Sequence, residues 1–399
     1  MSYILGIIIL VFGLVASIAL HELGHFIPAK RFGILTPQYM IGFGPTIWSK
    51  KIGETEYGVK WILLGGYVHM VGMYAPGRVG RKTTNRKGEL TWAEQARQEA
   101  VAEIPSGQES RAFYARPVWQ RLVVMLSGIL MNLALSLLCV GIALGAIGYA
   151  APSLRLAEVS AGSPAAQAGM QVGDKIVGVD GSEVSDWAAV QQGIGRTLPG
   201  KPARIAVQRG SERLELSVTP RESGGRSVIG VLPASQRYRA TPGDILKYEW
   251  AVMVATSKIL VALPVKLWET TLSLFETEKP RDPNSVMGIV GMGQIAGQIA
   301  STKAPGFTLA DRVASFLLMM GSLNLTLFLF NLIPLMPLDG GQAAGAVFEQ
   351  LRRWWCRLRG HPDPGPVDLA RVLPLTAAVV VAFIGMTVLL IVADIVKPV

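Results

Sequence analysis

The stretch Leu20-His21-Glu22-Leu23-Gly24-His25-Phe26 ends an apolar run in which residues 1–20 include no charged side chain. Because positions i and i+4 share one face of a helix, His21 and His25 can present two imidazoles to one metal ion. Glu22 stands beside them, where a carboxylate can serve a metal-bound water as general base. The apolar setting predicts that this chemistry takes place within a membrane.

The composition of the whole chain also favours a membrane protein. Of the 399 residues, 50% are hydrophobic and only 17% are charged, which is typical of an integral membrane protein with substantial polar regions. The net charge of +10 is interpreted as basic cytoplasmic loops beside an anionic lipid surface, and no nucleic-acid partner is expected. Cys139 and Cys356 occupy dissimilar surroundings, so no disulfide between them is expected.

Four long apolar segments predict four transmembrane helices, since roughly 20 residues cross the hydrocarbon. The first segment lacks the basic start of a signal peptide and is interpreted as a retained helix that ends at Lys30-Arg31. The predicted fold class is therefore a polytopic α-helical membrane protein. The four segments are residues 1–30 with the histidine motif, residues 118–150, residues 310–341 and residues 372–397.

Residues 31–117 are predicted to hold a membrane-associated β-region and a cytoplasmic loop. Gly-punctuated runs of β-branched and aromatic residues between positions 36 and 73 are typical of a small antiparallel sheet. Such a sheet could enter the membrane and offer an edge to an extended substrate, or it could be a soluble hairpin packed on helix ends. The pattern leaves both interpretations open. Farther along, Trp92–Ala102 predicts a short amphipathic helix in a polar loop.

Residues 151–235 predict one compact domain inserted between the second and third spans. A strand leads to a short helix capped by Ser163-Pro164, then to a Gly turn, a second strand and the hairpin signal Asp180-Gly181. Two further strands are expected at Ala203–Arg209 and Arg213–Thr219. The pattern resembles a PDZ domain, an α+β module that binds peptide termini by strand addition.

Residues 242–305 predict an amphipathic region at the membrane interface. The stretch from Ile245 to Phe275 is interrupted by Pro264 and carries interspersed charges, which favours a helix lying on the membrane rather than crossing it. The Gly-rich segment Val286–Gly293 is interpreted as a bend. Residues 342–371 are predicted to form a basic cytoplasmic loop.

A third metal ligand must come from elsewhere in the chain, because catalytic zinc commonly has three protein ligands and a water. His69 and His361 each stand alone in polar or sheet-like surroundings, and a non-ligand role is favoured for both. Asp339 follows two prolines at the end of the third apolar segment and precedes Gly340-Gly341. Unwound backbone is expected there, and an acidic residue at membrane depth is a functional candidate. Asp339 is therefore predicted as the third ligand, with spans one and three facing each other across the metal.

Polar and small residues in the second and third spans are further candidates. Helix packing is the favoured role for Gly128, whereas Asn132 could serve packing or face a substrate. Asn331 could stabilise an oxyanion or cap the end of its helix, and both roles stay open.

Taken together, these motifs resemble the site-2 protease family, the intramembrane zinc metalloproteases of peptidase family M50, of the bacterial regulator-of-sigma-E protease type. The resemblance rests on His21–His25, Gly128 with Asn132, the PDZ-like domain, and Asn331–Gly341 in the family's order. It implies that zinc is the cofactor, that His21, His25 and Asp339 are its ligands and that Glu22 is the catalytic acid/base. It also implies that the substrate-binding residues are Asn331, Asn132, Gly128 and Pro334.

The same resemblance implies that the substrate is a transmembrane helix of a single-pass membrane protein, typically an anti-sigma factor already cut by a first protease. The PDZ-like domain would then act as a size filter. The chain departs from the family pattern in three places: it has one such domain where many relatives have two, Met336 where a second proline is usual, and Gly288-Ile289-Val290-Gly291 where relatives often read Gly-Pro-Ile-Gly.

The basic residues predict an orientation in a bacterial inner membrane, since cytoplasmic loops carry an excess of Lys and Arg. Residues 30–121 hold fourteen basic and seven acidic residues, whereas residues 152–245 are nearly balanced, with eleven against nine. The PDZ-like domain and both termini are therefore expected outside the cytoplasm, with His21 and His25 toward the cytoplasmic side.

Two other functions are conceivable for a membrane protein with this motif. One is a non-catalytic, zinc-binding PDZ scaffold, which the loss of Glu22 or Asp339 would have favoured, and both residues are present. The other is a zinc transporter, which would need polar residues along a path through several spans. Only one such cluster is found, so an endopeptidase is the preferred interpretation.

Overall fold

A computed structural model describes residues 2–76, 83–84, 87–275, 281–282, 285–303 and 307–398. The chain forms two compact units, one of residues 1–143 with 241–399 and the other of residues 144–240. Parts of the predicted polar loop (77–82, 85–86) and of the predicted interfacial region (276–280, 283–284, 304–306) lie outside the described residues.

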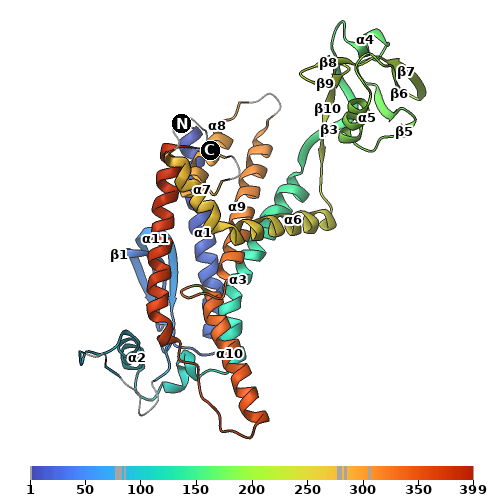
Figure 1. Cartoon of the computed structure of the whole chain (residues 1–399). Helices are drawn as coiled ribbons and strands as arrows, with labels where there is room; N and C mark the ends of the chain where they lie inside the picture. The colour runs from blue at the N-terminus through green and yellow to red at the C-terminus, as the bar shows by residue number, and fades with distance from the viewer. Residues whose placement is uncertain are drawn as a thin grey trace. The chain divides into compact units, whose positions relative to one another are not determined.

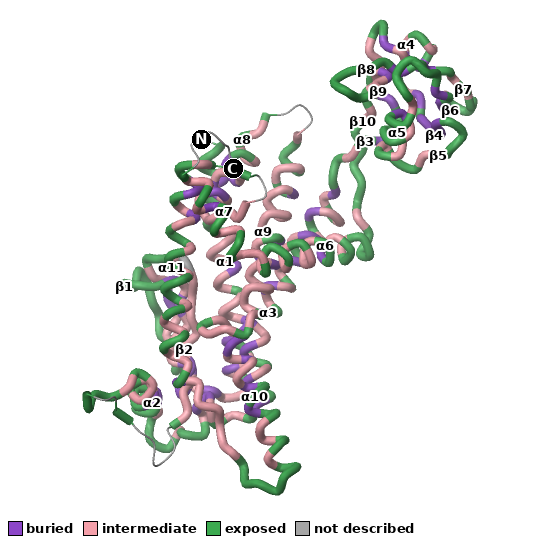
Figure 2. The backbone as a smooth tube through the Cα atoms, viewed as in Figure 1, coloured by how far each residue is buried: buried purple, intermediate pink, exposed green. Residues whose placement is uncertain are grey.

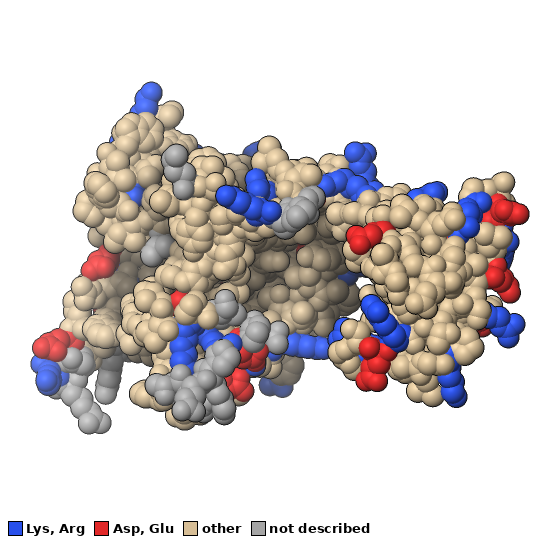
Figure 3. Space-filling model, turned by 90° about the horizontal axis from the view of Figure 1, so that it is seen from above, with Lys and Arg blue, Asp and Glu red and all other residues tan. Residues whose placement is uncertain are grey.

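Four apolar helices of the first unit, among the described residues, are long enough to cross a membrane, as predicted. Figure 1 shows them, and Figure 3 shows broad areas of surface without charged side chains. A further pair of helices, bent by 68°, could form a broken span by length and composition. The four helices are α1 (Ser2–Arg31), α3 (Val118–Val140, continued by the π-helical η3, Gly141–Ile147), α9 (Leu309–Asn331) and α11 (Leu373–Val396, preceded by η4, Leu369–Val372).

The bent pair comprises α6 (Pro242–Val261) and α7 (Leu263–Phe275), so the break predicted near Pro264 is present. Thr241 begins α6 with a capping box in which its side chain and that of Asp244 bond each other's backbone N–H. That this helix pair lies on the membrane rather than crossing it stays a prediction.

The predicted β-region is a hairpin of two long strands, β1 (Gln38–Ile52) and β2 (Thr55–His69). Each strand bends back on itself, so that Gln38 pairs with Glu56 on one side and with His69 on the other. The hairpin therefore behaves as a four-segment sheet in which residues 46–52 and 66–69 form the two edges. Tyr39 fixes this sheet to α1, since its hydroxyl donates to the Ala19 carbonyl over 2.6 Å.

The predicted amphipathic helix is α2 (Trp92–Ala102), with Thr91 as its N-cap. Arg97 is buried on α2 and donates to both carboxylate oxygens of Asp368, which joins the polar region to the segment before α11. Two short 3₁₀ turns follow α2 and lead into α3: η1 (Glu109–Arg111) and η2 (Phe113–Ala115).

Two segments, one predicted as a bend and one as a loop, are partly helical instead. The Gly-rich segment expected to bend continues into α8 (Ile289–Ser301), whose first turn is stabilised by Asp394: this carboxylate accepts the N–H groups of Gly288 and Gly291. The basic loop expected at 342–371 is helical to Leu358, because α10 (Asp339–Leu358) occupies its first half. Apolar residues recur along α10 at helical spacing, a signal that its arginine content obscured.

The second unit is a small sheet with two helices on a buried apolar core, which Figure 2 shows in purple. Its main sheet has the order β10-β3-β4-β6-β7, with β5 paired to β4. The two later strands and the Ser163-capped turn are found where the sequence predicted them. The elements are β3 (Tyr149–Val159), α4 (Pro164–Gln167), β4 (Lys175–Val179), β5 (Ser182–Glu183), α5 (Trp187–Arg196), β6 (Ala203–Arg209), β7 (Glu212–Val218), β8 (Arg221–Ser223), β9 (Arg226–Val228) and β10 (Val231–Tyr238).

One ion pair ties the loop before β4 to β6 within this unit. The side chain of Asp174 is 1% exposed and accepts two hydrogen bonds from the Arg209 guanidinium, both over 2.8 Å. Asp174 also accepts the backbone N–H of Gln171 over 2.9 Å. These bonds, the one from Arg209 above all, hold the pKa of the Asp174 carboxyl below its usual range.

We therefore expect Asp174→Asn to destabilise the second unit by about 2–3 kcal/mol, because it removes a charge-assisted bond to a buried acceptor. A depressed folded-state pKa adds stability above the unfolded pKa of about 4 and loses it as the pH falls through the folded value. The wild-type unit should lose this stability in acid, and the variant should lack that part of the pH dependence. Hydrogen exchange of the β4 and β6 amides in the full chain measures both effects, with the exposed Glu215→Gln as control. Equal protection in Asp174→Asn and wild type would contradict the expectation.

Candidate metal centre

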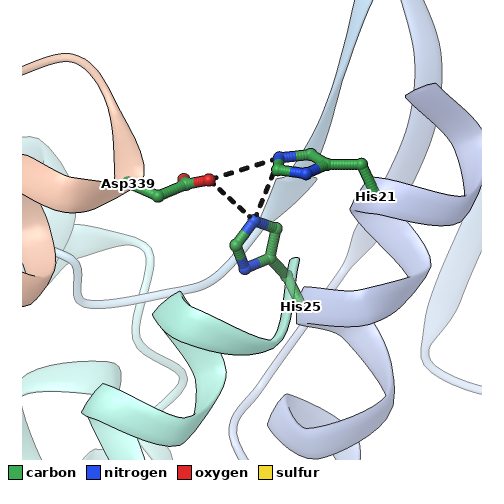
Figure 4. A group of neighbouring side chains, drawn as sticks. All are labelled: His21, His25 and Asp339. Carbon is green, nitrogen blue, oxygen red and sulfur yellow. Dashed lines mark hydrogen bonds and ion pairs between the residues drawn. The ribbon is translucent and has the colours of Figure 1, made fainter. Parts of the chain in front are cut away.

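Three side chains from distant parts of the chain converge in the first unit, as Figure 4 shows. The Nε2 atoms of His21 and His25 lie 3.3 Å apart. The Oδ2 atom of Asp339 lies 3.2 Å from the first and 3.1 Å from the second. The cluster is largely shielded from solvent, since the side chain of His25 is 5% exposed and that of His21 13%.

The size of this triangle fits a tetrahedral zinc ion. Ligand atoms about 2.0–2.1 Å from zinc lie about 3.3 Å from one another in a tetrahedron. The three edges match that separation, and two imidazoles with one carboxylate are a donor set that catalytic zinc accepts. The three residues therefore fit one zinc ion and leave a fourth position for water.

Helix α3 sets the direction of both imidazoles. The Nδ1 atom of His21 lies 2.9 Å from the Gly128 carbonyl, and that of His25 lies 2.7 Å from the Val124 carbonyl. A carbonyl can only accept, so each Nδ1 carries the proton and each Nε2 keeps a lone pair for a metal. The four-residue spacing of the two carbonyls matches that of the histidines, because α1 and α3 pack side by side.

Two glycines allow α1 and α3 to come this close. A Cβ atom on Gly24 would lie 2.8 Å from the Gly128 backbone, and one on Gly128 would lie 2.1 Å from Nε2 of His25. Small residues commonly permit such close helix contacts in membranes. Gly128 thus has the packing role that the sequence favoured. The His25 imidazole occupies the space that a side chain at position 128 would need.

Asp339 reaches the histidines from the first turn of α10 rather than from span three. Helix α9 ends at Asn331, and residues 332–338 form turns before α10 begins. The prediction that the third span extends to Asp339 is therefore wrong, whereas the unwound backbone expected there is present at residues 332–338. Helix α9 does face α1, since Leu327 and Asn331 line the same cavity as His21. Gly340 and Gly341 begin a helix instead of unwinding one: a Cβ on Gly340 would lie 2.4 Å from the Ile333 carbonyl oxygen.

A cavity of about 640 Å³ opens beside the cluster. His21 and Glu22 line it from α1, and Gly65 with Gly66 lines it from β2. Glu22 packs against this strand, since a Cβ on Gly66 would lie 2.9 Å from Cγ of Glu22. The rest of the lining is mostly apolar and comes from Ile18, Phe43, Asn132, Leu327, Asn331, Pro337, Leu338, Val380, Phe383, Ile384, Thr387 and Val388.

The predicted substrate-binding residues differ in their positions. Asn132 and Asn331 line the cavity, and the Asn132 amide also lies 3.1 Å from Nδ1 of His21. Gly128 lies behind the imidazoles and Pro334 is exposed in the turns after α9, so neither is among the residues that line this cavity. The substrate contacts of all four stay predictions.

The other two histidines lie away from the cluster. His69 lies 2.9 Å from a carboxylate oxygen of Glu103, and His361 is exposed. Within the described ranges, neither belongs to a group of side chains that could hold a metal ion.

Sequence reasoning missed several residues that shape this site. The Val124 carbonyl carries no side-chain signal, and the cavity wall from α11 could not be deduced from a uniformly apolar segment. Gly24 and Gly66 could have been suspected, since a glycine inside a motif helix or beside a second glycine in a strand indicates close backbone approach.

Comparisons with known proteins give a consistent result. The sequence profile of peptidase family M50 matches residues 9–361. The chain is 30% identical to zinc metalloprotease Rip1 of Mycolicibacterium smegmatis over 100% of its own length and 99% of that protein. It is 28% identical to metalloprotease MmpA of Caulobacter vibrioides, over 88% of each chain. It is 26% identical to the regulator of sigma-W protease RasP of Bacillus subtilis, over 86% of this chain and 89% of that one.

We expect Gly128→Ala to remove metal from the purified protein, because the added methyl group would occupy the space of the His25 imidazole. The control is Gly141→Ala, also on the path of the second span, where a Cβ meets nothing within 4 Å. Zinc content after gel filtration should fall well below one ion per chain in the first variant and stay near one in the second. Full zinc content in Gly128→Ala would show that the site tolerates the methyl group.

Proposed function

The chain belongs to peptidase family M50 and is a zinc metalloprotease, and from that premise we propose that it is an endopeptidase that cleaves a transmembrane helix of a single-pass membrane protein. The observation that supports this function best is the convergence of His21, His25 and Asp339 beside a cavity among apolar helices. Such a place gives a water molecule access to a peptide bond that the bilayer would otherwise shield.

His21, His25 and Asp339 would hold the zinc ion, with Nε2 of each imidazole and Oδ2 of the carboxylate as donors. Bound zinc lowers the pKa of its water to about 7 and polarises a carbonyl group. The Gly128 and Val124 carbonyls keep both imidazoles in the tautomer that this binding needs. Asp339 stands at the start of α10, where the helix dipole favours its negative charge.

Glu22 is the proposed catalytic acid/base. Its carboxylate would take the proton of the attacking water and then deliver it to the leaving amine nitrogen, so that one C–N bond breaks as one C–O bond forms. Asn331 and Asn132 line the same cavity. Either amide could donate to the carbonyl oxygen of the substrate as negative charge develops there.

The substrate segment must be extended to reach this cleft, because a helix buries its peptide groups in its own hydrogen bonds. The segment of β2 at residues 66–69 lies beside Glu22 and pairs with residues 38–41 on one side only, so an extended segment can be added on its other side. We propose that the hairpin lies within the membrane and holds the unwound substrate segment by strand addition.

The second unit is proposed to be a PDZ domain that binds a peptide terminus and so limits which substrates are cut. It offers a groove of about 880 Å³ between α5 and the start of β10. Strand β10 is an edge of its sheet, so a peptide can pair with it as PDZ ligands do. Trp187, Ile194 and Leu232 contribute apolar surface to the groove.

The proposed location is a bacterial inner membrane, with the second unit outside the cytoplasm and the metal site toward the cytoplasmic side. The distribution of basic residues supports this orientation. The proposed substrate is an anti-sigma factor already shortened by a first protease. The name of the Bacillus relative, a regulator of sigma-W protease, supports a substrate from sigma-factor signalling.

We expect Glu22→Gln to abolish cleavage of a membrane-inserted reporter while zinc stays bound. Loss of a general base lowers the rate by about 10²–10⁴-fold, and Glu22 is not one of the three proposed ligands. The exposed Glu158→Gln on β3 is the matched control and should cleave like wild type. Cleavage by Glu22→Gln at the wild-type rate would remove this residue from the mechanism.

We expect Gly195→Trp to weaken peptide binding without unfolding the second unit. Gly195 lines the groove and a Cβ there meets nothing within 4 Å, so an indole can occupy the groove without displacing other side chains. Gln192→Trp, on the same helix but not lining the groove, is the control. Fluorescence anisotropy with short labelled peptides should show weaker binding only in Gly195→Trp, and peptides with amidated ends should test the free carboxylate. Equal affinity in both variants would exclude this groove.

A further inference from the structure

The C-terminal half of α10 exposes a continuous apolar face. Its members recur at intervals of three and four residues, so they lie along one side of the helix. Their side chains are roughly half exposed in the first unit, where a soluble helix would bury them. They are Val347, Phe348, Leu351, Trp354, Trp355 and Leu358, and we call them the outer face of α10.

On the opposite side, the N-terminal half of α10 buries Gly340, Gly341, Ala343 and Ala346, and the C-terminal half buries the charged Glu349. Glu349 is 1% exposed and accepts hydrogen bonds from the Arg121 guanidinium of α3 and from the Val367 backbone N–H. Arg353 also pairs with Glu349, over 3.1 Å. The C-terminal half of α10 is therefore inverted relative to a helix on a soluble protein: Glu349 and Arg353 face the protein, and the apolar side chains face outward. Such an inversion indicates an apolar or amphipathic environment on the outer side.

Basic side chains border the outer face. Arg359 lies over the Trp355 ring, with its guanidinium carbon 4.4 Å from the ring centroid. Arg357 is exposed on the other border and has no ion-pair partner in the part of the chain that the structure describes. An apolar stripe with tryptophans and bordering arginines matches a bilayer interface, where arginine side chains reach anionic headgroups while their stems stay among apolar groups.

We propose that the outer face of α10 binds the headgroup and upper acyl region of an anionic bilayer surface. The helix starts at Asp339, directly after the turns that follow the membrane helix α9, and Glu349 in its middle pairs with Arg121 in the first turn of the membrane helix α3. The C-terminal half of α10 therefore lies near the end of that membrane helix. The charge of the bordering arginines selects anionic lipid over a second apolar protein surface. One consequence is that lipid contact at one end of α10 fixes the depth of its first residue, Asp339. The proposal does not depend on the protein's substrate.

The test measures the lipid contact of single labelled sites in the full chain. Cysteine is introduced at Leu351 in a background without Cys139 and Cys356, labelled with an environment-sensitive nitrobenzoxadiazole dye and reconstituted in phosphatidylcholine vesicles with or without phosphatidylglycerol. The control is Val172→Cys in the second unit, since Val172 is 66% exposed and Leu351 57%. Lipids with a quencher near the headgroup should remove about half of the emission at position 351 and little at position 172.

Charge reversal tests the anionic part of the proposal. Arg357→Glu combined with Arg359→Glu should reduce quenching at position 351 in phosphatidylglycerol vesicles, and should matter less in phosphatidylcholine alone. Zinc content reports whether each variant stays folded. Equal, weak quenching at positions 351 and 172 would overturn the proposal. So would efficient disulfide formation between Leu351→Cys chains of two copies without quenching, because it would assign the outer face to a second copy.

Discussion

The close approach of α1 and α3 is the contact on which the candidate site depends. Two carbonyls of α3 bond the Nδ1 atoms of His21 and His25, and two glycines give the helices the distance that those bonds need. A larger separation would free the imidazoles to rotate, and each would then present either nitrogen to the metal. The histidine motif therefore defines a metal site only together with a second helix that has no metal-binding side chain in the cluster.

The bilayer imposes a second condition, because unpaired backbone groups in hydrocarbon cost several kcal/mol each. Between α9 and α10 the chain forms turns with local hydrogen bonds, such as those from Leu335 N–H to Ile333 and from Leu338 N–H to Leu335. The same segment lines the cavity through Pro337 and Leu338. In the hairpin, the strands fold back and pair with each other on both sides of residues 38–41.

Much of this architecture could be predicted from the sequence, and the failures have a common cause. The four apolar helices, the hairpin, α2 and the strands β6 and β7 follow from hydrophobic period and length, which are local signals. The convergence of His21, His25 and Asp339 was expected from residue chemistry, and the structure brings the three side chains together. Their role as zinc ligands stays a prediction. The start of α10 at Asp339 was missed because prolines and glycines before it indicate a loop, whereas Gly340 and Gly341 are needed for close packing on residues 331–336. Such packing depends on the path of the turns at residues 332–338, and hydrophobic period and length do not report that path.

Buried acidic residues in the first unit show why the sequence alone could not distinguish an acidic residue with a structural role from a candidate metal ligand. The rule that an acidic residue among membrane helices is a functional candidate applies to Asp339, but it applies equally to Asp394 and Glu249, which are 1% and 4% exposed. The groups that contact each carboxylate distinguish the three residues. Asp394 pairs with the buried Arg281 and accepts two backbone N–H groups of α8, so its charge is compensated within the fold. Glu249 accepts from the Ser136 hydroxyl and links α6 to α3. Asp339 instead faces two imidazoles whose lone pairs point at its carboxylate, an arrangement of three acceptors that is stable only when a cation or shared protons lie between them. The groups that face each carboxylate, more than burial itself, distinguish a candidate metal ligand from a member of a structural ion pair.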